Sequence, residues 1–103
     1  MESSTDPSSG SEPHVVRHDD RGRYELTRGD EVLSFAVFSE SAGVVTVPHI
    51  ETKVHHRGNG YAADLMAGVV DDLRSRGLLI EPICSVARAY VEALPDADAL
   101  MVD

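Results

Sequence analysis

Residues 57–62 read Arg57-Gly58-Asn59-Gly60-Tyr61-Ala62 and mark the point at which the pattern of the chain changes. Before this segment the apolar residues follow the alternation and β-branched runs of strands. After it they recur every three or four residues, as in a helix. The two glycines let the backbone turn sharply between these patterns. The segment therefore predicts a connection from a strand into a helix.

The residues before this connection predict three antiparallel strands joined by short turns. The expected strands are residues 23–27, 32–38 and 44–50, with turns at 28–31 and 39–43. The middle run is rich in β-branched and aromatic residues, and places Phe35 and Val37 on one face and Ala36 and Phe38 on the other. Such a series of strands predicts a β-meander.

The residues after the connection predict a helix, a strand and a second helix. The first helix carries its apolar residues at helical spacing, namely Ala62, Leu65, Met66, Val69 and Leu73. Arg74 and Arg76 are cations, which the helix dipole favours in the last turn, and Gly77 is expected to end the helix. Residues 78–83 predict a short strand with Pro82 near its end, and Ser85 is the expected cap of a helix over 86–94. We therefore expect an α+β fold, an antiparallel meander followed by a helix–strand–helix unit packed on the sheet.

Length and composition limit what this chain can be. Its 103 residues suffice for one core, and a net charge of −9 argues against broad nucleic-acid binding. The polar residues 1–13 are expected to form a disordered tail, which leaves 14–103 as the domain. Cys84 is the one cysteine, so no intrachain disulfide is expected. No apolar run can span a membrane and no signal peptide is visible, which favours a cytoplasmic location.

The connection itself is suited to hold an anion. The N–H groups of Gly58 to Ala62 come first in the helix and lack partners within it, and the helix dipole favours negative charge at the same point. A phosphate site is therefore predicted here. An ordinary strand-to-helix turn is the alternative. Neither the P-loop pattern nor the Rossmann glycine pattern is present.

Several motifs together resemble a known family. Arg57-x-x-Gly60-x-Ala62 fits the [Q/R]-x-x-G-x-[G/A] signature of the GCN5-related N-acetyltransferases. The remaining matches, at the spacing of the small single-domain branch, are His49-Ile50-Glu51, Arg74-Ser75-Arg76-Gly77, Pro82-Ile83-Cys84-Ser85 and Leu94-Pro95-Asp96. Ile50, Thr52 and Val86 differ from the residues usual in that branch. All three fall on the side of the cleft that would receive the acceptor amine, and not on the pyrophosphate loop.

The resemblance implies acetyl-CoA as cosubstrate. Its pyrophosphate would bind the loop formed by Arg57, Gly58, Asn59, Gly60, Tyr61 and Ala62. The resemblance also places Cys84 near the thioester. Cys84 is then an acyl-carrying nucleophile, a residue that lines the site, or a small buried side chain.

Three further residues are candidates for the catalytic chemistry. His49 is of the right type to deprotonate an amine, and Glu51, on the same strand face, can assist it or attract a cationic acceptor. A structural histidine is the alternative. Tyr90 stands near the position of the tyrosine that protonates the leaving thiolate in larger relatives, and is otherwise a core residue. His55 and His56 are expected to be exposed in the loop, and no metal site is predicted.

The sequence thus predicts an N-acetyltransferase that transfers an acetyl group from acetyl-CoA directly to an unidentified amine, on a small molecule or a protein. The alternative is a CoA-binding sensor or partner-binding module without turnover, and a more distant one is an adaptor domain that binds no CoA. Neither nucleic acid nor a membrane is an expected partner.

Overall fold

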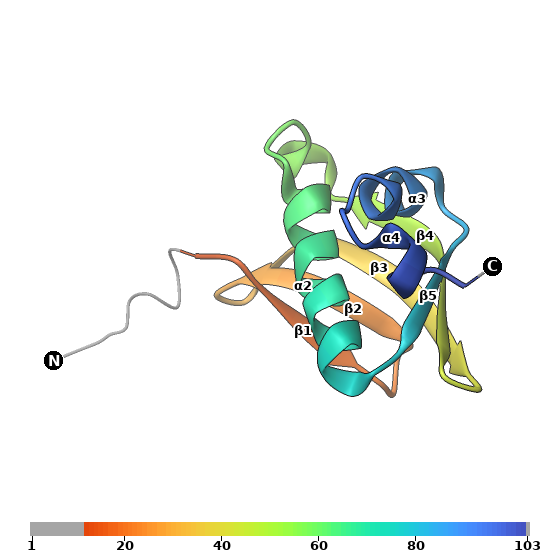
Figure 1. Cartoon of the computed structure of the whole chain (residues 1–103). Coiled ribbons are helices and arrows are strands. Elements are labelled where there is room, and N and C mark those ends of the chain that lie inside the picture. Colours follow the sequence, from red (N-terminus) through yellow and green to blue (C-terminus); the bar gives the residue numbers. More distant parts are fainter. Residues whose placement is uncertain (1–11, 103) are drawn as a thin grey trace, which may run out of the picture.

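The computed structural model describes residues 12–102 and shows a five-stranded sheet in the order β1-β2-β3-β4-β5 (Figure 1). The strands β1 to β4 pair antiparallel, and β5 pairs parallel to β4. The strands are β1 (His14–His18), β2 (Arg23–Arg28), β3 (Glu31–Ser41), β4 (Val44–Thr52) and β5 (Leu79–Pro82). The helices are η1 (Val54–His56), α2 (Tyr61–Arg76), α3 (Ser85–Glu92) and α4 (Ala97–Leu100). The tail predicted for residues 1–13 lies outside the described residues except for Glu12 and Pro13.

This architecture confirms the predicted α+β fold and its meander, and adds a strand that the sequence did not reveal. The added strand is β1, which pairs with β2 from His14 opposite Thr27 to His18 opposite Arg23. Its sequence, HVVRH, holds only two apolar residues between polar ones, so its alternation is too short to detect. The short helices η1 and α4 were also not predicted.

All three α-helices lie on the same side of the sheet. Figure 1 shows α2 across β1, β2 and β3, with α3 and α4 beside it towards β5. The core between these layers is aliphatic, as expected, apart from the buried rings of Tyr24 and Phe38. Gly68 of α2 is essential to this packing, because a Cβ at that position would come within 2.2 Å of the Val15 side chain. Among residues 12–102, no helix covers the other face of the sheet, which we call the open face.

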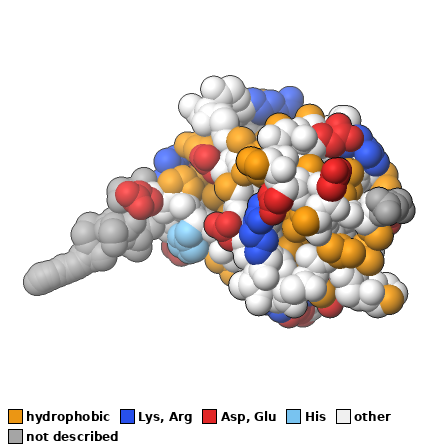
Figure 2. Space-filling model, viewed as in Figure 1, with side chains coloured by type: hydrophobic (Ala, Val, Ile, Leu, Met, Phe, Trp, Pro, Cys, Tyr) orange, Lys and Arg blue, Asp and Glu red, His pale blue; other side chains and the backbone are white. Residues whose placement is uncertain are grey.

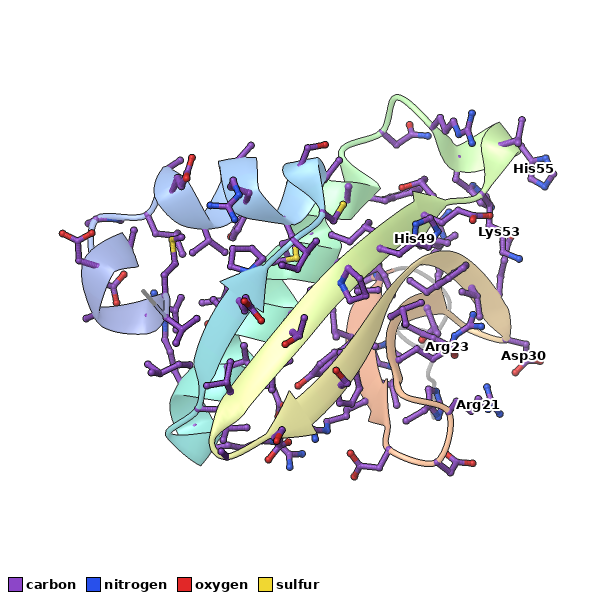
Figure 3. The ribbon with its side chains drawn as sticks, turned by 90° about the vertical axis from the view of Figure 1, so that its right-hand side faces the viewer. Arg21, Arg23, Asp30, His49, Lys53 and His55 are labelled. Carbon is purple, nitrogen blue, oxygen red and sulfur yellow. The ribbon has the colours of Figure 1, made fainter. Side chains whose placement is uncertain are left out.

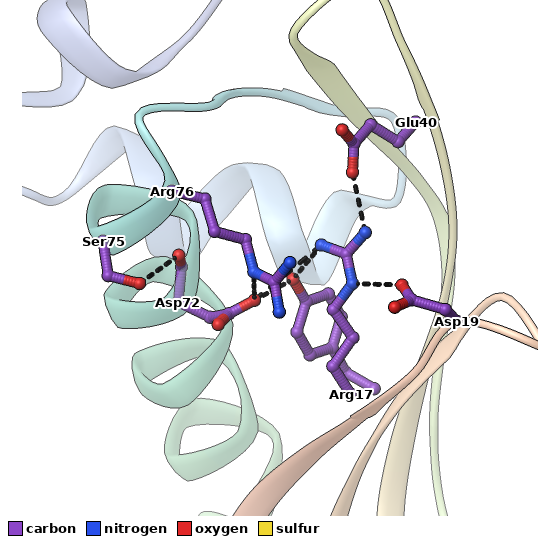
Figure 4. A network of polar contacts seen from close by, with 7 residues as sticks. Arg17, Asp19, Glu40, Asp72, Ser75 and Arg76 are labelled. Carbon is purple, nitrogen blue, oxygen red and sulfur yellow. Dashed lines mark hydrogen bonds and ion pairs between the residues drawn. The ribbon is translucent and has the colours of Figure 1, made fainter.

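A polar network fastens β1 and β2 to α2 (Figure 4). The Tyr24 hydroxyl donates to Asp72 over 2.7 Å and accepts from Arg17 over 2.9 Å. Arg17 also donates to Asp19 and Glu40, and Arg76 donates to Asp72. Burial of the Tyr24 hydroxyl, together with its bond to Asp72, raises the pKa of Tyr24 well above its ordinary value. The network therefore holds Tyr24 in its neutral, donating form.

A β-bulge in β4 decides which side chains reach the open face. Val37 pairs with His49 and Ser39 with Thr46, so Phe38 faces the two residues Val47 and Pro48. The extra residue shifts the alternation of the strand by one position. As a result Val47 is buried under the helices, whereas His49 emerges on the open face beside Phe35, with ring centroids 6.2 Å apart.

The ends of the helices agree with the sequence in one case and correct it in another. Helix α2 ends at Arg76, and its C-cap Gly77 adopts the left-handed conformation with φ of 69°. Helix α3 begins at Ser85 and ends at Glu92, so the predicted range of 86–94 was placed too far along the chain. The N-cap is Cys84, and the prediction that Ser85 caps this helix is wrong. In the part of the chain that the structure describes, no helix is long and apolar enough to cross a membrane.

Candidate functional site

The site forms where β4 and β5 separate. Their parallel pairing runs from Val44 opposite Leu79 to Val47 opposite Pro82. The carbonyl oxygen of Val47 then accepts from the amides of both Ile83 and Cys84, each over 3.1 Å. Beyond this point the chain turns into α3, while β4 continues to Thr52. The edge of β4 that faces α3 therefore has no strand partner from His49 onward.

A cleft of about 500 Å³ occupies this separation, which is a size suited to a small ligand. It is lined by His49, Ile50, Glu51, Thr52, Arg57, Ala62 and Val86. Successive residues of a strand point to opposite faces, so a cleft that touches the whole run from His49 to Thr52 lies along the edge of the strand. It thus reaches both the open face and the side that carries α2 and α3.

The predicted anion loop adjoins this cleft, with Arg57 and Ala62 in the wall. Gly58 and Gly60 have φ of 87° and 76°, which other residues rarely adopt. No atom lies within 4 Å of the place a Cβ would take at either glycine. Among residues 12–102, no backbone carbonyl accepts from the N–H groups of Gly58 to Ala63, and these groups lie at the start of α2. The loop therefore offers unpaired donors in open space.

Basic side chains surround the loop although the protein is acidic overall. Arg57 is exposed, and its Nε donates to the carbonyl oxygen of Thr52 over 3.3 Å. Lys53 and Arg28 lie nearby, the latter with its guanidinium 5.8 Å from the Tyr61 ring centroid. Figure 2 shows uncharged loop surface beside basic side chains at the end of the molecule where α2 begins. Arg57 thus provides a positive charge beside the unpaired amides, and acidic Asp64 also lies in the first turn of α2.

His49 and Glu51 lie side by side at the mouth of the cleft. His49 Nε2 is 3.3 Å from Glu51 Oε1, which confirms that the two share a strand face. Both side chains are about half exposed, at 56% and 50%. Figure 3 shows His49 standing on the open face, with α2 behind the sheet. Both groups are therefore accessible from the open face.

Cys84 and Tyr90 lie outside the wall of the cleft. Cys84 is half-buried as the N-cap of α3, and its neighbour Val86 lines the cleft. Tyr90 is also half-buried and packs against the hydrophobic core. The structure thus brings together His49, Glu51, Arg57 and Ala62 in the cleft wall. Cys84, at the N-cap of α3, and Tyr90, packed against the core, lie outside that wall.

His56 is not the exposed loop residue that the sequence suggested. Its side chain is only 15% exposed, and its Nε2 lies 2.6 Å from Glu31 Oε2. This hydrogen bond holds the pKa of the Glu31 carboxyl below its ordinary value. The partner lies 25 residues earlier, so local sequence could not reveal the contact. Among the described residues, no group of three or more His, Cys, Asp or Glu side chains is placed to hold a metal ion.

A second hollow, of about 410 Å³, lies between β1 and α2. Its lining includes Glu12, His14, Val15, Asp64 and Gly68. None of the predicted site residues lies there.

Comparison with known proteins identifies a family by its sequence model. The sequence model of one family, described as GCN5-related N-acetyl-transferase, matches residues 23–100. No curated protein has a sequence that matches the chain. The family is therefore identified from its sequence model, whose match covers most of the chain.

Solved structures with this fold have low sequence identity to the chain. The ribosomal-protein-S18-alanine N-acetyltransferase from Escherichia coli is 19% identical, with a TM-score of 0.61 over 77% of this chain and 54% of that one. A GCN5-like protein from Staphylococcus aureus is 15% identical, with a TM-score of 0.59 over 86% and 87% of the two chains. A GNAT-family protein from Desulfovibrio desulfuricans is 20% identical, with a TM-score of 0.53 over 68% and 51%. The chain thus spans about half the length of the first of these proteins.

Proposed function

The chain belongs to the GCN5-related N-acetyltransferase family, and we propose that it transfers an acetyl group from acetyl-CoA to an amine. The observation that carries this proposal is the loop of unpaired amides beside a cleft that ends at His49 and Glu51. Direct transfer within one complex is the mechanism we favour.

The cosubstrate fits the cleft in four respects. The pyrophosphate of acetyl-CoA is an anion, and the N–H groups of Gly58 to Ala62 can donate to it from the start of α2. The pantetheine arm contains amide groups, which suit the unpaired edge of β4. Gly58 and Gly60 leave the space through which phosphates would pass. Arg57 adds positive charge at the same place.

The reaction requires an amine without its proton, because an ammonium group has no lone pair with which to attack. His49, with Glu51 within hydrogen-bond distance of its Nε2, is the base that we propose for this step. The amine nitrogen then forms a bond to the thioester carbonyl carbon, and the carbon–sulfur bond breaks. The nitrogen releases its second proton as it becomes an amide, the CoA thiolate takes up one proton, and the proton held by His49 passes to water. Glu51 also attracts a cationic acceptor to the mouth of the cleft.

For Cys84 we propose a position near the thioester without an acyl-enzyme step. The thiol is half-buried at the start of α3, packs against the core and lies outside the wall of the cleft. Tyr90 would be a proton donor to the leaving thiolate only if the cosubstrate reached past the first turn of α3. The packing of Tyr90 against the core favours the structural role.

The acceptor is an amine that can reach the open face. No helix of the described residues encloses this face, so a protein amine has access as well as a small molecule. The Escherichia coli enzyme that shares the fold is named for an alanine of a ribosomal protein. Peptides with a free N-terminus therefore belong in any acceptor panel. The cytoplasmic location stays a prediction.

An acetylation assay over a broad panel of small amines and peptides tests this function. We expect release of free CoA thiol that depends on the acceptor, and loss of most of this activity in His49→Ala. A protein that binds acetyl-CoA but acetylates no acceptor would instead be the CoA-binding module. A protein that binds no CoA would contradict both readings.

A further inference from the structure

His56 connects two elements that are far apart in the sequence. From Lys53 to Gly60 every side chain is exposed except that of His56. Its Nε2 lies 2.6 Å from Glu31 Oε2 at the start of β3, and its ring meets the Tyr61 ring edge-on with centroids 5.9 Å apart. Tyr61 is the first residue of α2. His56 therefore links the β2–β3 turn to both ends of the loop.

The loop between His56 and Tyr61 has little support of its own. Its side chains are exposed, and the glycines at 58 and 60 have no atom near the Cβ position. One of its two side-chain hydrogen bonds within residues 12–102, from Asn59 Nδ2 to the carbonyl oxygen of His56 over 3.1 Å, leads back to His56 itself. The other runs from Arg57 Nε to the carbonyl oxygen of Thr52. Within the same residues the backbone of the loop is bonded only at its ends, where the Arg57 amide donates to Val54 and the Gly60 carbonyl oxygen accepts from Asp64. The order of the loop thus depends on how firmly its two ends are held.

Both ends are held by residues that flank the β2–β3 turn. Glu31 contacts His56 at one end, and the Arg28 guanidinium lies 5.8 Å from the Tyr61 ring centroid at the other. Figure 3 shows the turn, marked by Asp30, on the same side of the molecule as Lys53 and His55 of the loop segment. Asp30 is adjacent to Glu31 and carries the same charge, but makes no hydrogen bond or ion pair among the described residues.

We propose that Glu31, acting through His56, is a positioning residue that fixes the anion loop at residues 57–60 before the cosubstrate binds. Arg28 supports it through Tyr61. A loop that is already ordered loses less conformational freedom on binding, so its amides bind an anion more tightly. The inference rests on the proposed function, since it assigns the loop to coenzyme A.

The test compares Glu31→Ala with Asp30→Ala, which removes the same charge from the same turn. Backbone ¹⁵N order parameters of Gly58, Asn59 and Gly60 are measured without ligand, and coenzyme A affinity is measured by calorimetry. In Glu31→Ala we expect the order parameters to fall from about 0.85 towards 0.6. We also expect the Kd for coenzyme A to rise about two- to fivefold, as for loss of one hydrogen bond. In Asp30→Ala neither quantity should change.

Further measurements separate positioning from a general loss of structure. The kcat at saturating acetyl-CoA and the Tm should be nearly unchanged in Glu31→Ala. His56→Ala should match Glu31→Ala, and His56→Gln, whose amide nitrogen can still donate to Glu31, should recover part of the affinity.

Order parameters that are equal in Glu31→Ala and wild type would overturn the proposal, as would a mobile loop with unchanged affinity. If the wild type binds no coenzyme A, the proposed function fails, while the order parameters still decide whether Glu31 holds the loop.

Discussion

The N–H of Cys84 donates to the carbonyl oxygen of Val47 over 3.1 Å, and this bond marks the last contact between the backbones of the β4 and β5 segments. Up to Val47, β4 is paired with β5, and from His49 onward the same edge of β4 has no strand partner among the described residues. The β4 bulge opposite Phe38 lies at the same level and turns His49 onto the open face. One short region of the chain thus opens the cleft and orients the candidate base.

The first prediction concerns Gly60. Gly60→Ala should weaken coenzyme A binding at least tenfold, because the new Cβ enters the space where the phosphates pass. Gly43→Ala is the matched control, since Gly43 has φ of 81° and the same open surroundings but lies in the β3–β4 turn. Both variants should lose about 1 kcal/mol of unfolding free energy through backbone strain. Equal affinities in the two variants, measured by calorimetry, would rule out the loop as the pyrophosphate site.

A second prediction concerns the charge of Arg57. Arg57→Ala should lower coenzyme A affinity, and the difference from wild type should shrink as salt is raised, because salt screens an exposed ion contact. Arg76→Ala removes the same charge at the far end of α2 and should change the affinity little. A loss of affinity in Arg57→Ala that is independent of salt would show that Arg57 acts through its bond to Thr52.

A third prediction decides the role of Cys84. Cys84→Ala should retain measurable activity, and acetyl-CoA without acceptor should leave no adduct of about 42 Da on the wild-type protein. The reason is that the thiol is half-buried against the core. Intact-protein mass spectrometry checks the adduct. Acetylation of Cys84 at the rate of turnover, together with an inactive Cys84→Ala, would establish a covalent route.

The fourth prediction separates the two tyrosines. Tyr24→Phe should lower the unfolding free energy by about 1 kcal/mol, because it removes the hydroxyl that bridges Arg17 and Asp72. Tyr90→Phe should leave stability unchanged, since its hydroxyl makes no hydrogen bond to the described part of the chain. Urea unfolding measures both. If Tyr90→Phe instead abolishes turnover with its stability intact, Tyr90 is the proton donor after all.

Acid should also weaken the surface ion pairs. Hydrogen bonds from Arg17 and Arg74 lower the pKa of Asp19 and Asp96, respectively. Because these folded-state values lie below those of the unfolded chain, the stabilisation is present at neutral pH and is lost as pH falls through the lowered values. Both carboxylates are exposed, so the effect on stability is small.

The sequence predicted the elements whose pattern is local, and missed those that depend on distant partners. The meander and α2 follow from periodicity, and Gly77 ends α2 as expected. The strand β1 gains its stability from β2 and from Val15 against Gly68, neither of which its own five residues reveal. The general rule is that tertiary contacts override a weak local signal.

The site followed the same division. The unpaired amides of residues 58–62 and the contact of His49 with Glu51 could be predicted because each is formed by neighbouring residues. Their roles in binding and catalysis stay predictions. The contact of His56 with Glu31 was not, because two exposed-looking polar residues give no sign of meeting. Pro48 was an unused signal for the bulge, since proline within a sheet is confined to edges and bulges.

Titration of ¹⁵N-labelled protein with acetyl-CoA, followed by amide chemical shifts, tests the central claim most directly. We predict saturable shifts that are largest at Gly58 to Ala62 and extend to Ile50 and Thr52 on the free edge of β4. Residues of the hollow between β1 and α2, such as Val15 and Gly68, should be unaffected. The absence of saturable shifts at the loop, or larger shifts at Val15 and Gly68, would contradict the assignment of this cleft to acetyl-CoA.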